Sequence, residues 1–492
     1  MKTGSRPLLI AAAIFLAADA VFLLRHTSFS VGGSDSSGYL NTAKRMMAGT
    51  LVNRPRTLDR LGLPDREVEL FTPLGFVTGP RGTMAPLYPA GFPAHMAGAA
   101  LLLGWNVGPF LVAPISALLC LLLFYLLARE LSLSPLPAAA GTILFAAWPV
   151  AIGQAIQPMS DATATLWCLA SVLCAVQARR RALWALPAGA ALGIAVLVRP
   201  TDLLLAIPLA FALPITRRAL ALFAVGGAPF AGFLAAFNRH CYGSALQSGY
   251  RQSGLLDALA LANFPPRLRH YGAWILRSLT PFMPLAWLAL AFDREPRWRD
   301  RALLLSWFGS FFLFYCLYEP YDSFWFVRFL LPAAPALFLG ALIAARDVSA
   351  RLRGFPRAAL AVLLFGVVLF AEIRTLRTVG ILHTAESESI YPQICGWAAR
   401  TVPPGGIVLS MAASGALEHY TDLSYARWEW LTPEKFADLR LRVEGRGSRW
   451  FALLFPFEWE QLPQHAPGNW RKIGQLRQVG LWELEKEGVG SR

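Results

Sequence analysis

The chain contains little charge for its length. Only 15% of its 492 residues are Asp, Glu, Lys or Arg, whereas 55% are hydrophobic, and the mean hydropathy is +0.46. Ordinary soluble domains are more charged and less apolar, and here the apolar residues recur in runs long enough to cross a bilayer. The composition therefore excludes an ordinary soluble protein and predicts a polytopic α-helical membrane protein.

Acidic residues are scarce relative to basic ones, 30 against 45, which gives a formal net charge of +15. Such a balance can indicate nucleic-acid binding, but the arginines gather in short loops between apolar runs. Arginines in that position orient a protein in the bilayer. We therefore expect the membrane as a partner and no nucleic acid.

Cysteine is also rare, with six in the chain. Four lie within apolar runs, which leaves Cys241 and Cys395 as the only plausible extracytoplasmic pair. The spacing fits neither a disulfide framework nor a set of metal ligands. There is also no internal repeat of fixed period and no low-complexity tract.

The first apolar run, Pro7 to Leu24, predicts a retained signal anchor, since no clear small-residue cleavage site follows it. A polar first outer loop follows over residues 26–108, and its Pro-rich part, Ala85 to Gly104, predicts a helix along the interface. We expect about eleven transmembrane helices in all. The N-terminus would be cytoplasmic and the C-terminus outside, since this choice puts the Arg-rich loops inside. The later predicted spans are Phe110–Ala128, Pro137–Ile156, Ala162–Val176, Leu183–Val198, Thr201–Ile215, Ala219–Phe237, Ala273–Phe292, Ala302–Tyr318, Phe329–Ala345 and Ala358–Ala371.

Hydropathy falls after Arg374, and the pattern becomes that of a small soluble domain. We predict a membrane domain over residues 1–375 and an extracytoplasmic α/β domain over residues 376–492. The expected elements are an amphipathic helix at Ile390–Arg400, buried strands at Ile407–Ser410 and Phe451–Phe455, and an edge strand at Gln475–Leu484.

A lone carboxylate, Asp35, stands among Gly and Ser at the start of the first outer loop. Small neighbours allow a substrate hydroxyl to approach, and Tyr39, four residues on, would share its helical face, so we interpret Asp35 as a catalytic base. The alternative is an ordinary helix N-cap with Ser36 beginning a surface helix.

Two further charged positions fall on the same outer side under this topology. Asp161 begins a span and would orient Asp35 or hold the acceptor, unless it is only a helix cap or dipole partner. Arg199 lies between two apolar runs, where arginine is costly and often functional. The alternative is a snorkelling Arg199 paired with Asp202.

An aromatic and acidic loop, Tyr318 to Pro332, precedes another span. Arg328 lies at the mouth of that helix, where a planar guanidinium suits a lipid phosphodiester. Trp325 and Phe326 fit an ordinary interfacial aromatic belt. The outer loop from Asn238 to Tyr271 also contains arginines that orientation does not explain.

In order and spacing, these motifs resemble the GT-C integral membrane glycosyltransferases of the protein-mannosyltransferase and aminoarabinose-transferase branch. The likeness covers nearly the whole membrane part and rests on short motifs. They are Gly33-Ser34-Asp35 to Tyr39, Pro86-Leu87-Tyr88-Pro89-Ala90-Gly91-Phe92-Pro93, Met159-Ser160-Asp161, Val198-Arg199-Pro200-Thr201 and Arg328-Phe329-Leu330-Leu331-Pro332.

The resemblance implies transfer of a hexose or pentose from a polyprenyl-phosphate donor to a glycan, lipid or protein hydroxyl, with inversion, at the outer face of a bacterial inner membrane. Asp35 would take the acceptor proton as attack proceeds, because a carboxylate with a pKa of about 4 cannot remove it beforehand. Arginines would stabilise the departing phosphate. No cofactor is expected, and a divalent metal is not favoured, since Ser36 occupies the position where the family often has a second acid. The predicted catalytic residues are Asp35 and Asp161, and the predicted substrate-binding residues are Tyr39, Tyr88, His95, Arg199, Arg239, Tyr250, Arg251, Tyr321 and Arg328.

Two other classes of function fit many helices and scattered boundary charges. One is a transporter or lipid flippase, which the absence of repeats and of ionisable residues deep in the spans, Asp19 excepted, counts against. The other is a scaffold that presents the C-terminal domain outward. Neither requires an Asp together with Arg at two other outer helix mouths.

Overall fold

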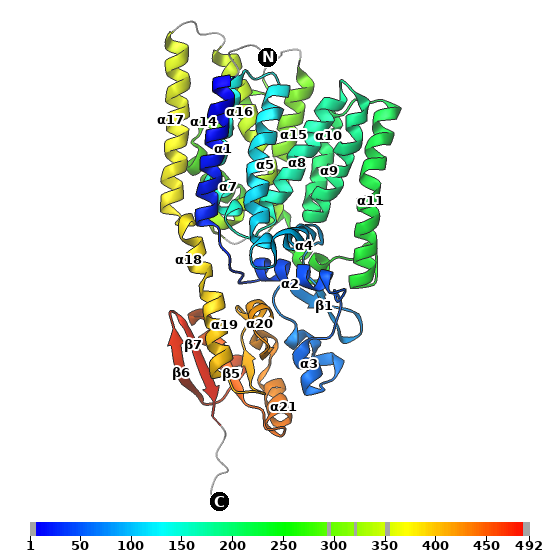
Figure 1. Cartoon of the computed structure of the whole chain (residues 1–492), viewed down its shortest axis with the longest axis vertical. Helices are drawn as coiled ribbons and strands as arrows, with labels where there is room; N and C mark the ends of the chain where they lie inside the picture. The colour runs from blue at the N-terminus through cyan, green and yellow to red at the C-terminus, as the bar shows by residue number, and fades with distance from the viewer. Residues whose placement is uncertain (1–5, 293–296, 319–321, 350–354, 486–492) are drawn as a thin grey trace, which may run out of the picture. The chain divides into compact units, whose positions relative to one another are not determined.

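The computed structural model describes residues 6–292, 297–318, 322–349 and 355–485. Contacts divide the chain into two compact units (Figure 1). The first comprises Met1–Thr27, Trp105–Leu234 and Leu256–Ala385, and the second comprises Ser28–Gly104, Ala235–Leu255 and Glu386–Arg492. The second unit therefore joins most of the first outer loop to the C-terminal segment, a grouping that the sequence did not predict. The predicted division after residue 375 stays a prediction.

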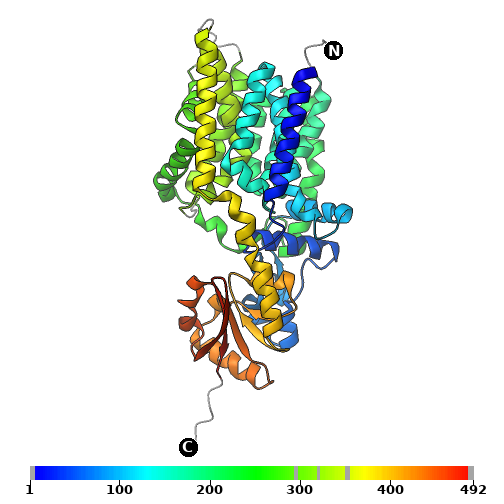
Figure 2. The ribbon, with the colours of Figure 1, turned by 60° about the vertical axis from the view of Figure 1, so that its left-hand side comes forward.

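The first unit is a bundle of apolar helices (Figures 1 and 2). Short 3₁₀ segments link several of them, among them η4 (Ala182–Trp184), η5 (Pro200–Leu205) and η8 (Phe324–Ala333). Its helices are α1 (Arg6–His26), α5 (Gly108–Glu130), α6 (Pro135–Ala147), α7 (Pro149–Ala155), α8 (Asp161–Ala178), α9 (Ala185–Val198), α10 (Ala206–Ala212), most of α11 (Arg217–Tyr242), α13 (Phe264–Leu279), α14 (Phe282–Ala289), α15 (Trp298–Leu317), α16 (Ala334–Ser349) and α17 (Phe355–Thr378).

Among the described residues, six helices are long and apolar enough to cross a membrane, or seven if a bent pair counts as one span. The chain is thus an integral membrane protein, as predicted, while the count of about eleven spans is not confirmed. The bent pair is α6 and α7, which meet at 63°. Pro149 begins α7, and because proline has no N–H and clashes with the preceding turn, the helix breaks there.

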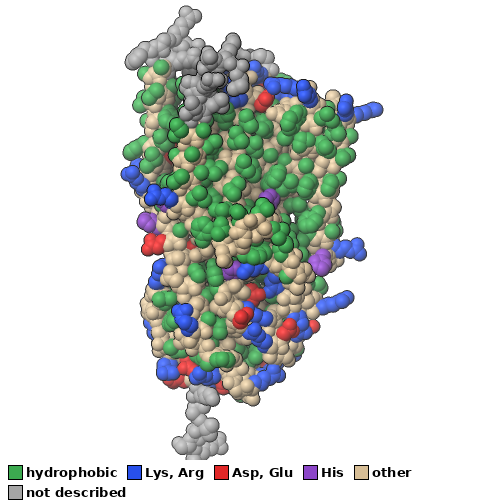
Figure 3. Space-filling view, viewed as in Figure 1, with side chains coloured by type: hydrophobic (Ala, Val, Ile, Leu, Met, Phe, Trp, Pro, Cys, Tyr) green, Lys and Arg blue, Asp and Glu red, His purple; other side chains and the backbone are tan. Residues whose placement is uncertain are grey.

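Backbone contact brings two helices of the bundle together. A Cβ atom on Gly189 of α9 would lie 1.9 Å from the carbonyl oxygen of Phe223 in α11, and one on Gly226 would lie 2.0 Å from that of Leu186. Only glycine permits this approach, which is a common device of membrane helices. Figure 3 shows hydrophobic side chains over most of the visible surface of the bundle and Lys and Arg gathered at its upper end.

The N-terminal part of the second unit consists of short elements. They are α2 (Asp35–Met47), α3 (Arg56–Leu61), the 3₁₀ helix η2 (Asp65–Phe71), the antiparallel pair β1 (Phe76–Thr78) and β2 (Met84–Pro86), α4 (Gly91–Leu103) and, from residues 235–255, α12 (Gly249–Gln252). At 13 residues, α4 is short for a span.

The C-terminal part is an α/β fold, as predicted. Five strands lie in the order β4-β3-β5-β7-β6, with β4, β3 and β5 parallel and the last two pairings antiparallel. Helix α19 covers one face of the sheet and α21 the other (Figure 2). The elements are α19 (Ile390–Thr401), β3 (Ile407–Leu409), α20 (Ser414–Tyr420), β4 (Ser424–Ala426), α21 (Pro433–Glu444), β5 (Trp450–Leu454), α22 (Pro456–Trp459), α23 (Leu462–His465), β6 (Trp470–Leu476) and β7 (Val479–Leu484).

The predicted helix at 390–400 and the strands at 407–410 and 451–455 are confirmed to within a residue or two. The single edge strand predicted at 475–484 is wrong. Arg477 takes a left-handed φ of 52°, so the chain turns and Leu476 pairs with Val479 in a hairpin. The buried strand β7 is internal and the exposed β6 forms the edge. No Gly, Asn or Pro marks this turn, which explains the error.

Candidate functional site

Asp35 is the first residue of α2. The N-cap is Ser34, whose side chain makes no capping hydrogen bond. The side chain of Asp35 accepts a hydrogen bond from the Tyr88 hydroxyl, at 2.5 Å from Oδ1. The hydroxyls of Ser34 and Tyr88 are 2.8 Å apart. Asp35 is therefore not the N-cap, and its carboxylate is oriented by a phenol.

Tyr88 is almost fully buried in the second unit, with 6% of its surface exposed. Burial, and then the charge of the Asp35 carboxylate, raise the pKa of the Tyr88 phenol well above its usual value. The phenol therefore stays protonated at any pH at which the protein works, and it remains a donor to the carboxylate.

Aromatic rings line this part of the second unit. The ring of Tyr39 lies 4.7 Å from that of Tyr88 and 5.0 Å from that of Phe92, and Tyr250 meets Tyr88 edge-on at 6.1 Å. We name Ser34, Asp35, Tyr39, Tyr88, Phe92 and Tyr250 the Asp35 cluster. Among the predicted residues, the structure thus brings together Asp35, Tyr39, Tyr88 and Tyr250.

Two glycines make this cluster possible. A Cβ atom on Gly75 would lie 2.3 Å from the Cα atom of Gly38, and one on Gly38 would lie 2.8 Å from the Tyr88 ring. Gly75 also has a left-handed φ of 87°. The loop before β1 therefore packs directly on α2, and the close approach holds Tyr88 beside Asp35.

The other predicted residues of this unit are His95, Arg239 and Arg251. His95 makes a 2.7 Å contact through Nδ1 with the Gly91 carbonyl of its own helix. Arg239 and Arg251 are exposed on α11 and α12. Tyr321, the remaining predicted residue, lies outside the described residues.

Asp161 begins α8 in the first unit and is 1% exposed. Its N-cap, Ser160, makes no side-chain capping hydrogen bond. Arg199 Nη1 donates to Asp161 Oδ1, and Arg328 Nη1 lies 3.6 Å from Oδ2. Two guanidinium groups, each on a 3₁₀ segment or its cap, therefore share one buried carboxylate.

Aromatic side chains surround these two arginines. Arg199 Nη2 donates to the Tyr315 hydroxyl at 3.3 Å, and that hydroxyl donates to Thr201 at 2.8 Å. The ring of Phe329 stacks on Tyr315, and the guanidinium carbons of both arginines lie 5.4 Å from the Phe329 centroid. We name Asp161, Arg199, Thr201, Tyr315, Arg328 and Phe329 the arginine cluster.

A snorkelling arginine keeps its guanidinium in water, whereas the Arg199 side chain is only 11% exposed. Asp202 is fully buried in η5 and lies close enough to Arg199 to interact with it electrostatically. Fixed cations above aromatic faces, partly neutralised by carboxylate, can bind a phosphate that replaces the carboxylate oxygens as acceptor.

Tyr315 is not among the residues predicted from sequence, and Ser34 enters there only as part of a motif, with no role of its own. Tyr315 lies in the last turn of an apolar helix, where a tyrosine reads as an ordinary member of the interfacial belt. Ser34 reads as a cap. Their contacts come from packing between segments distant in sequence, a feature that no local pattern contains.

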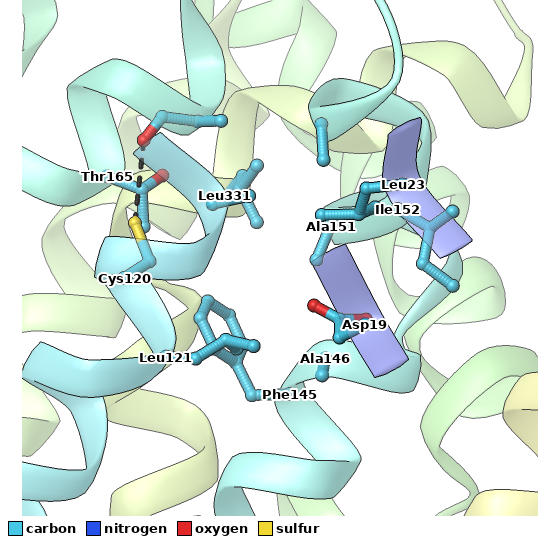
Figure 4. A pocket seen from close by; sticks show the side chains of 13 residues that line it. Asp19, Leu23, Cys120, Leu121, Phe145, Ala146, Ala151, Ile152, Thr165 and Leu331 are labelled. Carbon is cyan, nitrogen blue, oxygen red and sulfur yellow. Dashed lines mark hydrogen bonds between the residues drawn. The ribbon is translucent and has the colours of Figure 1, made fainter. Parts of the chain in front are cut away.

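A small cavity of about 30 Å³ lies in the first unit beside α8. Figure 4 shows the Asp19 carboxylate of α1 directed into it, with Phe145, Leu331 and Thr165 on other walls. The volume suits one or two water molecules and is too small for a lipid chain.

Cys241 and Cys395 are both free thiols, and they are buried in different hydrophobic clusters.

Within the described residues, no group of three or more His, Cys, Asp and Glu side chains has an arrangement that could hold a metal ion. The prediction that the protein works without a metal or other cofactor stays a prediction.

The chain has the fold of the GT-C integral membrane glycosyltransferases, as its motifs predicted. The structure of ArnT from Cupriavidus metallidurans bound to undecaprenyl phosphate is similar with a TM-score of 0.61 and 13% sequence identity, over 98% of this chain and 99% of that one. Apo ArnT gives a TM-score of 0.59 and 14% identity, over 98% of both chains.

A mutant of the arabinofuranosyltransferase AftD from Mycobacteria is also similar, with a TM-score of 0.55 and 12% identity. The match covers 99% of this chain and 42% of AftD, so the chain spans less than half of that protein. No family model and no curated protein matches the sequence.

Proposed function

We propose that the protein transfers a sugar from a polyprenyl-phosphate donor to a hydroxyl acceptor. The observation that carries the proposal is the arginine cluster, in which two buried guanidinium groups converge on one carboxylate at the ends of apolar helices. Such a group suits the phosphate of a lipid whose chain stays in the bilayer. The fold shared with ArnT, whose structure holds undecaprenyl phosphate, supports the same reading.

In this reaction the acceptor oxygen attacks the anomeric carbon while the bond between that carbon and the phosphate oxygen breaks. The acceptor proton passes to the Asp35 carboxylate during attack, and the configuration at the anomeric carbon inverts. Tyr88 holds Oδ1 of Asp35 by its 2.5 Å hydrogen bond, which fixes the orientation of the base. The partly exposed ring of Tyr250 offers an apolar face on which a sugar can stack, whereas the buried Tyr39 packs against Tyr88 and Phe92 and supports the site from behind.

Negative charge grows on the phosphate oxygen as the sugar leaves. Arg199 and Arg328 stabilise that charge, because their guanidinium groups are fixed in place by the Asp161 carboxylate and by Phe329 before the reaction begins. Asp161 would act on the arginines rather than on the sugar, which modifies the catalytic role predicted from sequence.

The donor is a hexose or pentose linked to polyprenyl phosphate, and the acceptor is a hydroxyl of a glycan, lipid or protein. We place the reaction at the extracytoplasmic face of a bacterial inner membrane, with the N-terminus in the cytoplasm. Clustering of arginine in the predicted cytoplasmic loops supports this orientation.

The test uses the full chain in detergent with radiolabelled polyprenyl-phosphate sugars and a panel of hydroxyl acceptors. Wild type should release polyprenyl phosphate and label an acceptor. Arg328→Ala should raise the KM for the donor by about 10- to 100-fold, the effect of losing a hydrogen bond to a charged group. Arg328→Lys should recover part of the loss, since it restores charge but not the planar fork.

Arg180→Ala is the matched control, because Arg180 is exposed and pairs with Glu130. Its KM should equal that of wild type. An absence of release with every donor would contradict the proposal. Movement of intact sugar lipid across vesicles without release would favour a flippase instead.

A further inference from the structure

Helix α20 of the C-terminal sheet packs directly on α2 within the second unit. The Asn41 side chain donates to the Gly415 carbonyl at 3.0 Å, and its Oδ1 contacts His419 Nδ1 at 3.3 Å. A Cβ atom on Gly415 would lie 2.1 Å from Ser37 Oγ and 3.0 Å from the carbonyl oxygen of Leu74. The helix that begins at Asp35 is therefore in close contact with a helix far along the chain, since Asn41 and Gly415 are 374 residues apart.

Charged groups join the same two helices. Glu418 of α20 pairs with Arg45 of α2 at 2.5 Å and with Arg56 at 3.3 Å, and it accepts from the Tyr425 hydroxyl at 2.9 Å. The side chains of Arg45 and Glu418 are only 12% and 11% exposed. A shielded carboxylate with three donors is held far more firmly than a surface ion pair.

The first outer loop also shares a hydrophobic core with the sheet. Leu58 and Phe71 from the loop are fully buried in one cluster with Trp428, Phe436 and Trp450. The segment that follows α2 in the first outer loop and the sheet therefore form one folded body.

Glu458 fixes the segment that leads into α20. Its buried carboxylate accepts from the backbone N–H groups of Met411, Ala412 and Phe455 and from the indole of Trp428, at 2.9–3.1 Å. These groups lie at the carboxyl ends of β3 and β5, where the strand order reverses and where open α/β sheets usually bind ligands. Here the protein's own carboxylate satisfies the donors, so this edge of the sheet acts as a support.

We propose that the C-terminal sheet positions the catalytic base: α20, through Gly415 and Glu418, holds α2 so that Asp35 keeps its hydrogen bond to Tyr88. Gly415 and Glu418 are positioning residues, since they act through α2. The role of Asp35 as base rests on the proposed function, whereas the contact of α20 with α2 does not.

Hydrogen–deuterium exchange of the full chain tests whether α20 holds α2 in place, and it does not require turnover. In Glu418→Gln and Gly415→Ala, amides 35–47 should exchange about tenfold faster or more, while amides 433–444 of α21 keep their wild-type rate. Asp422→Asn is the matched control, because its side chain is fully exposed and 3.9 Å from Arg56. It should leave both segments unchanged.

The turnover rate of the same variants is then measured and divided by the concentration of molecules that bind polyprenyl phosphate, which gives a kcat per binding molecule. This ratio removes any loss of folded protein, and we expect it to fall about 10- to 100-fold because the base is misplaced. In the double variant Arg45→Gln with Glu418→Gln, the fall should not exceed that of Glu418→Gln alone.

Unchanged exchange of amides 35–47 in both variants overturns the proposal. So does faster exchange with an unchanged kcat per binding molecule. A wild-type protein that releases no polyprenyl phosphate contradicts the proposed function, and the exchange result still decides whether α20 holds α2.

Discussion

Helices α2 and α8 both begin at an aspartate that follows a serine, and in both the serine side chain makes no capping hydrogen bond. Their surroundings differ. Asp35 is hydrogen-bonded by the neutral phenol of Tyr88, whereas Asp161 lies between two guanidinium groups. The Asp35 carboxylate thus has a hydroxyl as its donor, while both oxygens of the Asp161 carboxylate face guanidinium groups. The proposed mechanism uses this difference: it gives proton transfer to Asp35 and phosphate binding to the arginines around Asp161.

The largest expected effect is the loss of kcat when Asp35 is substituted. Asp35→Asn keeps an oxygen that can accept from Tyr88 but removes the base, so kcat should fall by about 10²- to 10⁴-fold. Radiolabel release by purified variant and wild type measures this. Equal turnover would show that another group takes the proton.

Asp161→Asn should affect stability more than proton transfer. Removing one partner of a buried ion pair costs about 3–5 kcal/mol, because Arg199 and Arg328 lose their shared anion. The apparent melting temperature should therefore fall, and polyprenyl phosphate should raise it by more than it does in wild type. A thermal shift that is the same in both proteins would contradict the phosphate-binding role.

A smaller effect is expected from Tyr88→Phe. The loss of a hydrogen bond to a charged group costs about 1.5–3 kcal/mol, so kcat should fall about 10- to 100-fold with donor KM unchanged. Tyr242→Phe is the control, since that hydroxyl donates to the Pro86 carbonyl at 2.7 Å. If kcat falls equally in both variants, the hydrogen bond from Tyr88 does not orient Asp35 for catalysis.

The smallest effect concerns pH and stability. Burial, and then the nearby Lys44, lower the pKa of His419 to about 4 from its usual value of about 6.5. Below pH 6.5 the unfolded chain therefore binds a proton that the folded chain does not, and the folded state loses stability as the pH falls from 6.5 to 4. In His419→Gln the melting temperature should decline less over this range. A decline equal to that of wild type would show that other groups cause it.

Much of this architecture could be predicted from the sequence, because it depends on local patterns. Apolar runs indicated the membrane helices, and hydropathy after Arg374 indicated the α/β segment. Asp35, Asp161, Arg199 and Arg328 stand out in the sequence because charge at the ends of apolar runs is costly and therefore unusual.

Other features depend on contacts between distant residues. Nothing near Asp35 in sequence indicates Tyr88 as its partner, since the pairing requires Gly38 and Gly75 to meet. Likewise, the local sequence around Glu418 and around Arg45 is typical of surface residues and does not indicate that the two side chains pair. The hairpin at Arg477 was missed because a residue other than Gly or Asn takes the left-handed conformation there.

The division of roles between the two aspartate sites is tested most directly by the equilibrium dissociation constant of polyprenyl phosphate for two variants of the full chain. Asp35→Asn should bind it as tightly as wild type, because the base does not hold the phosphate. Arg328→Ala should bind it about 10- to 100-fold more weakly. Equal affinity of wild type and Arg328→Ala, or a loss of affinity in Asp35→Asn, would contradict the account.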